Sequence, residues 1–359
     1  MTYGIGFKTD KAAFLIADGL ISEKPKNKEL EEAFGQFSTT GRLLQNKTYT
    51  FTESLQKVRE IDEGMLATFA TNDVDGTLQA LDDVKTLIDA GRPIEKAFSS
   101  AFRKIENIEI LFSYSEKGEP KLFSFNLNKD RLINEHHSGE VVAIGSGKHH
   151  SLLHENSKNF IESTIKNVQN DPADMLAHAL GGLTSIMSSS HLLSVLDYQV
   201  GGNLFGGYVT GTSSHMMKDT LYIFYTIVNG NLKVQNEVSI LNSPSLNLIY
   251  SSFGDKDDGR FIGYSNDKKA SKEDRHKVYK QLLVNYLNGK LEYAVGIDTQ
   301  KPVYFLCKQK NHRGFKFRSF NKETSKIQVC LHPSIVADIK KNYKSADLLS
   351  GGYKRINTK

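Results

Sequence analysis

Thr2 is the residue whose type and position most directly suggest chemistry in this chain of 359 residues. It follows Met1, and removal of Met1 would leave a threonine with both a hydroxyl group and a free α-amine. The amine can act as the base that activates the hydroxyl, so one residue would supply a complete catalytic couple. The sequence therefore predicts a nucleophile at the N-terminus.

A β-hairpin over residues 1–22 would hold this nucleophile in place. A first apolar run precedes a turn at residues 9–11, and a second apolar run over residues 12–17 ends at Asp18-Gly19. Two such runs around a short polar turn are typical of a hairpin. Pairing within a sheet would restrain a chain end that otherwise frays.

Composition places the chain among ordinary globular proteins. It is 39% hydrophobic and 24% charged, which argues against disorder, and its length allows one large domain or two ordinary ones. It contains no apolar run of transmembrane length and no signal-peptide pattern at the N-terminus. Two cysteines, Cys307 and Cys330, do not make a disulfide framework. We expect a cytoplasmic, reduced protein that does not associate with membranes.

The net charge of +5 is unevenly distributed along the chain. Residues 231–359 contain 24 basic and 12 acidic side chains, whereas residues 1–230 contain 22 and 29. This asymmetry suggests two units with different partners. We therefore expect one domain over residues 1–229 and a basic C-terminal extension of strands and a helix over residues 230–359.

Strand and helix signals alternate in blocks rather than in single β–α steps. The pattern predicts helices over residues 73–90, 93–105, 149–168 and 171–196, and strands over residues 49–51, 65–70, 108–114, 121–126, 141–144 and 220–228. Two sheets packed face to face, with helix pairs outside, would satisfy this order. In the extension we expect strands over residues 291–297, 303–308 and 314–320 around a helix over residues 270–288.

Four short patches lie in order along residues 2–229. They are Thr2 with Ala17-Asp18-Gly19, then residues 56–61 (Gln-Lys-Val-Arg-Glu-Ile), then residues 66–71 (Leu-Ala-Thr-Phe-Ala-Thr) before a helix, and last residues 144–147 (Ile-Gly-Ser-Gly) with residues 197–202 (Asp-Tyr-Gln-Val-Gly-Gly). Together they resemble the proteasome β-subunits and bacterial threonine peptidases, which are N-terminal nucleophile hydrolases. The resemblance implies an α+β fold, a four-layer αββα sandwich of two antiparallel sheets between helix pairs, with a C-terminal mixed α/β extension.

The resemblance also implies roles for five residues. Thr2 would be the nucleophile, and the Lys57 ammonium beside it would lower the cost of forming the alkoxide. Asp18 would pair with Lys57, so that the buried charge is compensated. Ser146 and Asp197 would hold the α-amine and a water molecule through hydrogen bonds.

Three further residues would meet the substrate. The backbone N–H of Thr71 would donate to the oxyanion of the tetrahedral intermediate, and Phe69 and Asp73 would line the pocket before the scissile bond. The expected reaction is cleavage of a peptide or unfolded protein bound as an added strand, through an acyl-enzyme on Thr2. The resemblance implies no metal or organic cofactor. It implies a homo-oligomer, because family members build rings, and residues 230–359 could dock an unfoldase or an acidic partner.

Two alternatives concern the same domain. Met1 could be retained and catalysis lost, leaving an assembly or binding module; Val200, where the family often has a serine that contacts the amine, favours this reading. An amine could instead intercept the acyl-enzyme, which would make the protein a peptide ligase or transpeptidase.

Other residue clusters suggest alternatives that we consider weaker. Phenylalanines alternate with basic residues over residues 312–320, a pattern that could bind nucleic acid, but an amphipathic strand explains it better. His149, His150 and His154 are spaced to chelate a metal, yet a solvated helix start is the better interpretation. Cys307, Cys330 and His332 are too sparse for a zinc site.

Overall fold

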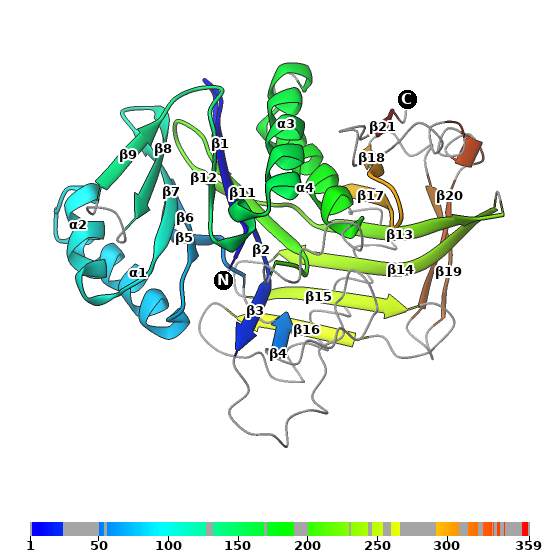
Figure 1. Ribbon diagram of the computed structural model, residues 1–359, viewed down its shortest axis with the longest axis horizontal. Helices are drawn as coiled ribbons and strands as arrows, with labels where there is room; N and C mark the ends of the chain where they lie inside the picture. The colour runs from blue at the N-terminus through cyan, green and yellow to red at the C-terminus, as the bar shows by residue number, and fades with distance from the viewer. Residues whose placement is uncertain are drawn as a thin grey trace. The chain divides into compact units, whose positions relative to one another are not determined.

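The computed structural model describes most of the chain. It describes residues 2–23, 50–53, 56–126, 132–168, 171–189, 200–229, 231–242, 246–253, 260–265, 292–308, 315–321, 326–331, 333, 336–337, 341 and 354–357. The chain divides into two compact units (Figure 1). Unit 1 comprises residues 1–21, 56–176 and 195–217, and unit 2 comprises residues 22–55, 177–194 and 218–359.

The first sheet of unit 1 is antiparallel and has the strand order β10-β1-β2-β11-β12. Its strands are β1 (Gly4–Lys8), β2 (Ala13–Asp18), β10 (Val141–Ile144), β11 (Leu204–Val209) and β12 (Ser214–Met216). The hairpin expected over residues 1–22 is present as β1 and β2, with Gly4 opposite Ala17. The backbone N–H of Asp18 donates to the carbonyl of Tyr3, so this register brings Asp18 beside the start of the chain.

The second sheet of unit 1 is also antiparallel, with its strands in chain order. They are β5 (Arg59–Asp62), β6 (Met65–Ala70), β7 (Glu109–Glu116), β8 (Glu119–Asn126) and β9 (Leu132–His136). The two sheets meet at Gly6 of β1, where an added Cβ would lie 3.2 Å from methyl groups of Leu111 and Leu122. The expectation of helices combined with two antiparallel sheets is confirmed. Two strands of this sheet, β5 and β9, were not predicted.

The helices of unit 1 lie close to the predicted ranges. They are α1 (Val74–Asp89), α2 (Ile94–Ala101), α3 (Ser151–Asn167) and the first turn of α4 (Pro172–Ser188), with short 3₁₀ turns at Phe102–Lys104 and Ser146–His149. Asp73 caps α1, because its Oδ1 accepts a hydrogen bond from the Gly76 N–H at 2.9 Å. Residues 190–196 of the predicted fourth helix lie outside the described part of the chain.

Aromatic side chains join the helices of unit 1 to its sheets. Phe98 of α2 stacks on Phe112 of β7, with ring centroids 4.1 Å apart, and Phe112 stacks on Phe123 of β8 at 5.3 Å. Tyr3 presents its ring edgewise to His154 of α3 at 6.4 Å. An aromatic contact thus joins α2 to the second sheet, and another joins α3 to the residue just before β1.

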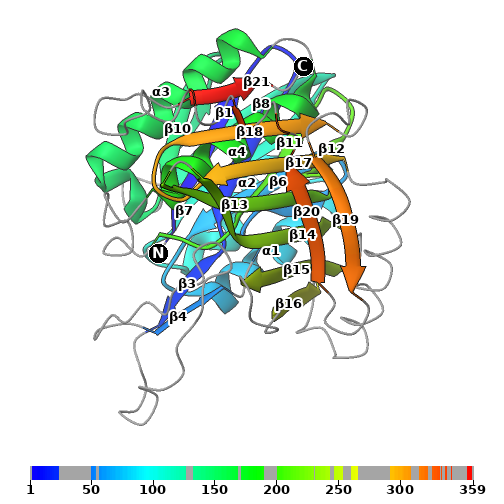
Figure 2. The same ribbon diagram turned by 90° about the vertical axis from the view of Figure 1, so that its right-hand side faces the viewer.

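Unit 2 contains a seven-stranded mixed sheet with the order β16-β15-β14-β13-β17-β18-β21, whose strands are seen in Figure 2. The strands are β13 (Thr220–Val228), β14 (Asn231–Asn242), β15 (Leu246–Phe253), β16 (Arg260–Ser265), β17 (Tyr293–Asp298), β18 (Val303–Lys308) and β21 (Lys354–Asn357). β13 pairs with β14 antiparallel and with β17 parallel. The expected domain boundary after residue 229 therefore falls inside a hairpin of one sheet, because pairing, rather than charge, decides where β13 belongs.

The other described elements of unit 2 are two small sheets and part of α4. Two two-stranded sheets are formed by β3 (Leu20–Glu23) with β4 (Thr50–Glu53), and by β19 (Phe315–Asn321) with β20 (Lys326–Leu331). Later residues of α4 pack on the large sheet, where a Cβ added to Gly181 would lie 3.1 Å from Tyr304 and Val295. The helix expected over residues 270–288 lies outside the described residues. Among the helices that are described, none combines the length and the apolar character needed to cross a membrane.

Candidate active site

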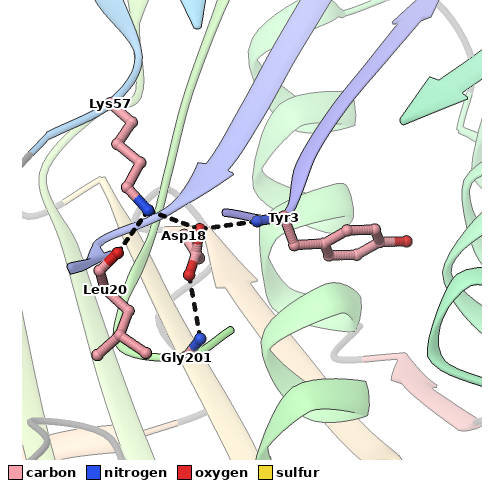
Figure 3. Close-up of polar contacts among 5 residues, drawn as sticks. All are labelled: Tyr3, Asp18, Leu20, Lys57 and Gly201. Atoms are coloured by element: carbon pink, nitrogen blue, oxygen red, sulfur yellow. Dashed lines mark hydrogen bonds and ion pairs between the residues drawn. The ribbon is translucent and has the colours of Figure 1, made fainter. Parts of the chain in front are cut away.

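A buried ion pair lies at the end of the N-terminal hairpin. Asp18 is the last residue of β2 and is fully buried, and Lys57, just before β5, is 3% exposed. The Lys57 Nζ lies 3.1 Å from Asp18 Oδ1 and also donates to the carbonyl oxygen of Leu20 at 2.5 Å (Figure 3). The structure thus brings together two predicted site residues that are 39 positions apart in sequence.

Two backbone N–H groups complete the environment of the Asp18 carboxylate. The Tyr3 N–H donates to Oδ1 and the Gly201 N–H donates to Oδ2, each at 3.0 Å (Figure 3). The side chain of Tyr3 points away from the carboxylate. Asp18 therefore links three separate segments of unit 1 and accepts hydrogen bonds on both oxygens, which keeps its buried charge solvated by the protein.

The charge of Lys57 is under opposing influences. Burial lowers the pKa of the Lys57 ammonium below its usual range, and the Asp18 carboxylate acts in the opposite direction by attraction and by its hydrogen bond. Desolvation penalises the charged form of an amine, whereas an opposite charge at hydrogen-bond distance favours it. The pair places a desolvated cation in the interior, where its field is screened little by solvent.

Thr2 is buried and fixed on both sides of its carbonyl group. Its carbonyl oxygen accepts a hydrogen bond from the Gly147 N–H at 3.3 Å. The peptide nitrogen that follows it, that of Tyr3, shares Asp18 Oδ1 with the Lys57 ammonium. The ammonium therefore lies within two hydrogen-bond lengths of the peptide nitrogen next to Thr2.

The glycine turn predicted over residues 145–147 packs against Thr2. Gly145 has φ +83°, and a Cβ at this position would lie 2.0 Å from the Thr2 carbonyl oxygen. Glycine is thus required here both for its backbone conformation and for the close approach. Ser146 lies inside this turn, at the start of the 3₁₀ segment. Asp197, the other residue expected to hold the amine, lies outside the described residues.

The three residues expected to meet substrate follow one another along β6 and into α1. Phe69 is buried within β6, and Thr71 follows the end of this strand. The Thr71 hydroxyl accepts from the Asp73 N–H at 3.0 Å, and the Asp73 carboxylate caps α1. The side chains of Thr71 and Asp73 therefore organise the start of α1.

Sequence reasoning missed two groups that contribute to the site. Gly201 lies in the patch over residues 197–202 that resembles the family, but no role was predicted for its N–H. Glu109 was not predicted to be a site residue. The Glu109 Oε2 accepts from the Gly145 N–H at 2.6 Å, and Oε1 pairs with Lys148. No local pattern marks Glu109, because β7 and residue 145 belong to different sheets and only the packing of these sheets brings them together.

The histidine cluster has structural contacts. His150 caps α3, with its Nδ1 3.3 Å from the Leu153 nitrogen. His154 Nδ1 lies 3.3 Å from the Tyr3 hydroxyl, and burial lowers the pKa of His154. Within the part of the chain that the structure describes, no group of three or more His, Cys, Asp or Glu side chains could hold a metal ion. Cys307 lies in β18 and Cys330 in β20, and His332 is outside the described residues.

No protein-family model matches this sequence, and neither does any curated protein. The geometry offers a buried hydroxyl-bearing residue, Thr2, a desolvated ammonium and a carboxylate that binds both this ammonium and the amide of Tyr3, the residue after Thr2. Such an arrangement can stabilise an alkoxide or another developing negative charge.

Proposed function

We propose that this protein is an N-terminal threonine amidohydrolase of the proteasome-like class, which cleaves peptide bonds through an acyl-enzyme on Thr2. The observation that carries the proposal is the buried Asp18–Lys57 pair, tied through Asp18 to the amide of Tyr3, the residue after Thr2. A buried ion pair contributes little net stability. Perturbed ionisable groups cluster at functional sites, so this location beside a potential nucleophile supports catalysis.

The proposed reaction begins when the Thr2 hydroxyl oxygen attacks the substrate carbonyl carbon. The hydroxyl proton passes to the free α-amine of Thr2, through a water molecule, and the Lys57 ammonium stabilises the negative charge on the attacking oxygen. The resulting oxyanion accepts a hydrogen bond from the backbone N–H of Thr71. Collapse breaks the C–N bond, the leaving amine takes the proton, and water then hydrolyses the ester that remains on Thr2.

The supporting residues keep their expected roles in this proposal. Ser146 and Asp197 hold the α-amine and the water, and the position of Ser146 in the turn against Thr2 supports its part. Phe69 contributes to the substrate pocket. Asp73 meets substrate with the acceptor capacity that remains on its carboxylate after Oδ1 accepts the Gly76 N–H.

The proposal includes the four-layer αββα sandwich for unit 1. Contacts of Gly6 with Leu111 support the packing of the two sheets on each other. The stacking of Phe98 on Phe112 and the contact of Tyr3 with His154 support helices on the outer faces. In this arrangement Thr2 and Asp18 lie at one end of two interior strands of the first sheet, β1 and β2.

We also propose the assembly and location that accompany such a peptidase. The protein would form a homo-oligomer and act on a peptide or unfolded protein, with residues 230–359 available to an unfoldase or an acidic partner. The excess of basic side chains in that segment supports an acidic partner. A cytoplasmic location belongs to the same proposal and rests on the sparse use of cysteine.

A second function, that of a catalytically silent assembly or binding module, is favoured by Val200. This residue is fully buried and directly precedes Gly201, whose N–H binds Asp18. Val200 thus brings a methyl-bearing side chain, without a hydroxyl, next to the site. In this reading Met1 is retained and Thr2 has no free amine. A ligase or transpeptidase would use the same site as the peptidase and differ only in the acceptor.

Intact-mass analysis with a peptide epoxyketone, an electrophile that reacts with the hydroxyl and amine of an N-terminal threonine, tests the proposal. We expect the purified protein to have lost Met1 and to form a one-to-one adduct on Thr2. Thr2→Ala should form none, whereas Thr86→Ala, a control on α1 whose hydroxyl only contacts the Asp82 carbonyl, should react like the wild type. Retention of Met1 would favour the silent module, and a processed terminus that forms no adduct would overturn the peptidase proposal.

A further inference from the structure

We infer that Glu109 is a positioning residue for Thr2, acting through the glycine turn over residues 145–147. The inference rests on the proposed function, since it assigns Glu109 a part in orienting the proposed nucleophile. Among the contacts that the structure describes, those of Glu109 are with Gly145, Lys148 and Asn126 rather than with Thr2 itself. Its effect passes through the backbone of the turn, which contacts Thr2 directly.

The Glu109 carboxylate is tied to the start of this turn. Glu109 is the first residue of β7 and its side chain is 14% exposed. Oε2 accepts from the Gly145 N–H at 2.6 Å, and Oε1 accepts from the Lys148 ammonium and from the Asn126 side-chain amide at 3.1 Å. Hydrogen bonds to an ionised acceptor are stronger than neutral ones, so one carboxylate of the second sheet holds the backbone at the start of the turn and pairs with the side chain of Lys148, the residue that follows the turn.

The glycine turn packs closely against the backbone of Thr2. The space beside Gly145 is filled by the Thr2 carbonyl, and the Gly147 N–H donates to that carbonyl at 3.3 Å. A hydrogen bond of this length is weak by itself. The position of the turn therefore depends on its other attachments, which include the pairing of Ile144 with Gly4 just before the turn and the short bond from Gly145 to Glu109.

Thr2 is consequently held from two sides by two carboxylates. Asp18 binds the amide of Tyr3 on one side, and Glu109 fixes the turn that binds the Thr2 carbonyl on the other. Rotation about the Thr2 backbone would move both its hydroxyl and its α-amine. Small errors in the placement of a nucleophile reduce the rate of attack steeply, so loss of Glu109 should slow the reaction without weakening substrate binding.

The test uses the full chain and the peptide epoxyketone, with Glu109→Ala and Glu109→Gln as variants. The rate constant for adduct formation at saturation, kinact, should fall about tenfold or more in Glu109→Ala, while the half-saturating concentration, KI, stays unchanged. The kinact of Glu109→Gln should lie between those of the wild type and Glu109→Ala, because the glutamine amide oxygen can still accept a hydrogen bond from the Gly145 N–H. Glu135→Gln is the matched control: it removes a carboxylate that pairs with Lys121 on the same sheet, and it should react like the wild type.

Amide hydrogen exchange of Gly147 and Tyr3 supplies a second readout that does not need activity. We expect faster exchange of the Gly147 amide in Glu109→Gln, with the circular dichroism spectrum of the wild type retained. Wild-type kinact in a folded Glu109→Ala protein, or a change in KI alone, would overturn the inference. If the wild type itself forms no adduct, the proposed function fails. In that case, a Gly147 exchange rate that is the same in Glu109→Gln as in the wild type would separately overturn the positioning role of Glu109.

Discussion

Each unit of the molecule contains a fully buried aspartate at the last residue of a strand, and the two carboxylates differ in their hydrogen-bond partners. Asp18 ends β2 in unit 1 and receives the Lys57 ammonium together with two backbone N–H groups, so both its oxygens are bonded. Asp298 ends β17 in unit 2 and receives the N–H groups of Gln300 and Lys301 on Oδ1 alone. Its Oδ2 has no hydrogen-bond partner among the described residues.

The difference shows how burial is compensated. Burial raises the pKa of Asp298 to about 6, and the two backbone N–H groups offset only part of this effect. In the Asp18–Lys57 pair, burial lowers the pKa of Lys57, and the Asp18 carboxylate has this cation at hydrogen-bond distance. Asp298 caps the turn between β17 and β18, an ordinary structural use of aspartate. A buried carboxylate by itself is therefore no sign of function; its cation and its neighbour Thr2 distinguish Asp18.

The largest effect expected from this comparison is that of Lys57→Met. Removing the ammonium leaves the Asp18 charge buried without a counterion, which typically costs about 3–5 kcal/mol. We expect urea-induced unfolding to show a loss of this size. Faster amide exchange at Tyr3 and Gly201, the two backbone donors to Asp18, would locate the loss in unit 1.

The double variant Asp18→Asn/Lys57→Met is the control for that loss. It removes both charges, so most of the stability lost in Lys57→Met should return. Non-additivity of this kind is expected for residues in direct contact. If Lys57→Met unfolds like the wild type, Asp18 is not held as a buried charge and the contrast with Asp298 disappears.

An intermediate effect is expected for Asp298→Asn, and its sign depends on pH. A carboxyl group whose pKa is raised from 3.8 to about 6 binds its proton more tightly in the folded protein. Its contribution to stability is present below pH 3.8 and is lost as pH rises through 6. Asparagine carries no charge and keeps an oxygen for Gln300 and Lys301, so this variant should be about 1–3 kcal/mol more stable than the wild type at pH 8.

The same variant should gain nothing at pH 4, where the wild-type carboxyl group is largely protonated. Urea-induced unfolding at both pH values, with amide exchange at Gln300 and Lys301, checks this expectation. An equal gain at the two pH values would mean that titration of Asp298 does not account for it.

The smallest effect is expected for Lys85→Met, which removes an exposed ion pair. Lys85 Nζ lies 2.6 Å from Asp62 Oδ1, shorter than the Lys57–Asp18 distance, but the lysine is 48% exposed. Exposed pairs contribute little to stability and are screened by salt. We expect a small loss of stability that shrinks further in high salt. A loss of stability equal to that of Lys57→Met would show that the distance between the charged atoms, rather than burial, determines how much each ion pair contributes to stability.

Much of the local structure of unit 1 was predictable from sequence. The hairpin of β1 and β2, the Asp73 cap and the range of α1 follow from apolar patterns and from a capping side chain, which act over a few residues. The pairing of Asp18 with Lys57 was expected only because four patches resembled a known family. Nothing within either segment requires them to meet.

Tertiary structure alone decided the rest, because strand pairing joins residues that are remote in sequence. Pairing with β14 and β17 places β13 in unit 2, against the boundary expected from charge. Gly201 reaches Asp18 across 183 positions, and Glu109 reaches Gly145 across 36. By itself the sequence determined the candidate nucleophile, the N-terminal hairpin and the approximate ranges of the helices of unit 1. The register of the sheets determined which of those residues share a buried site, since that register is set by packing over the whole unit rather than by neighbouring residues.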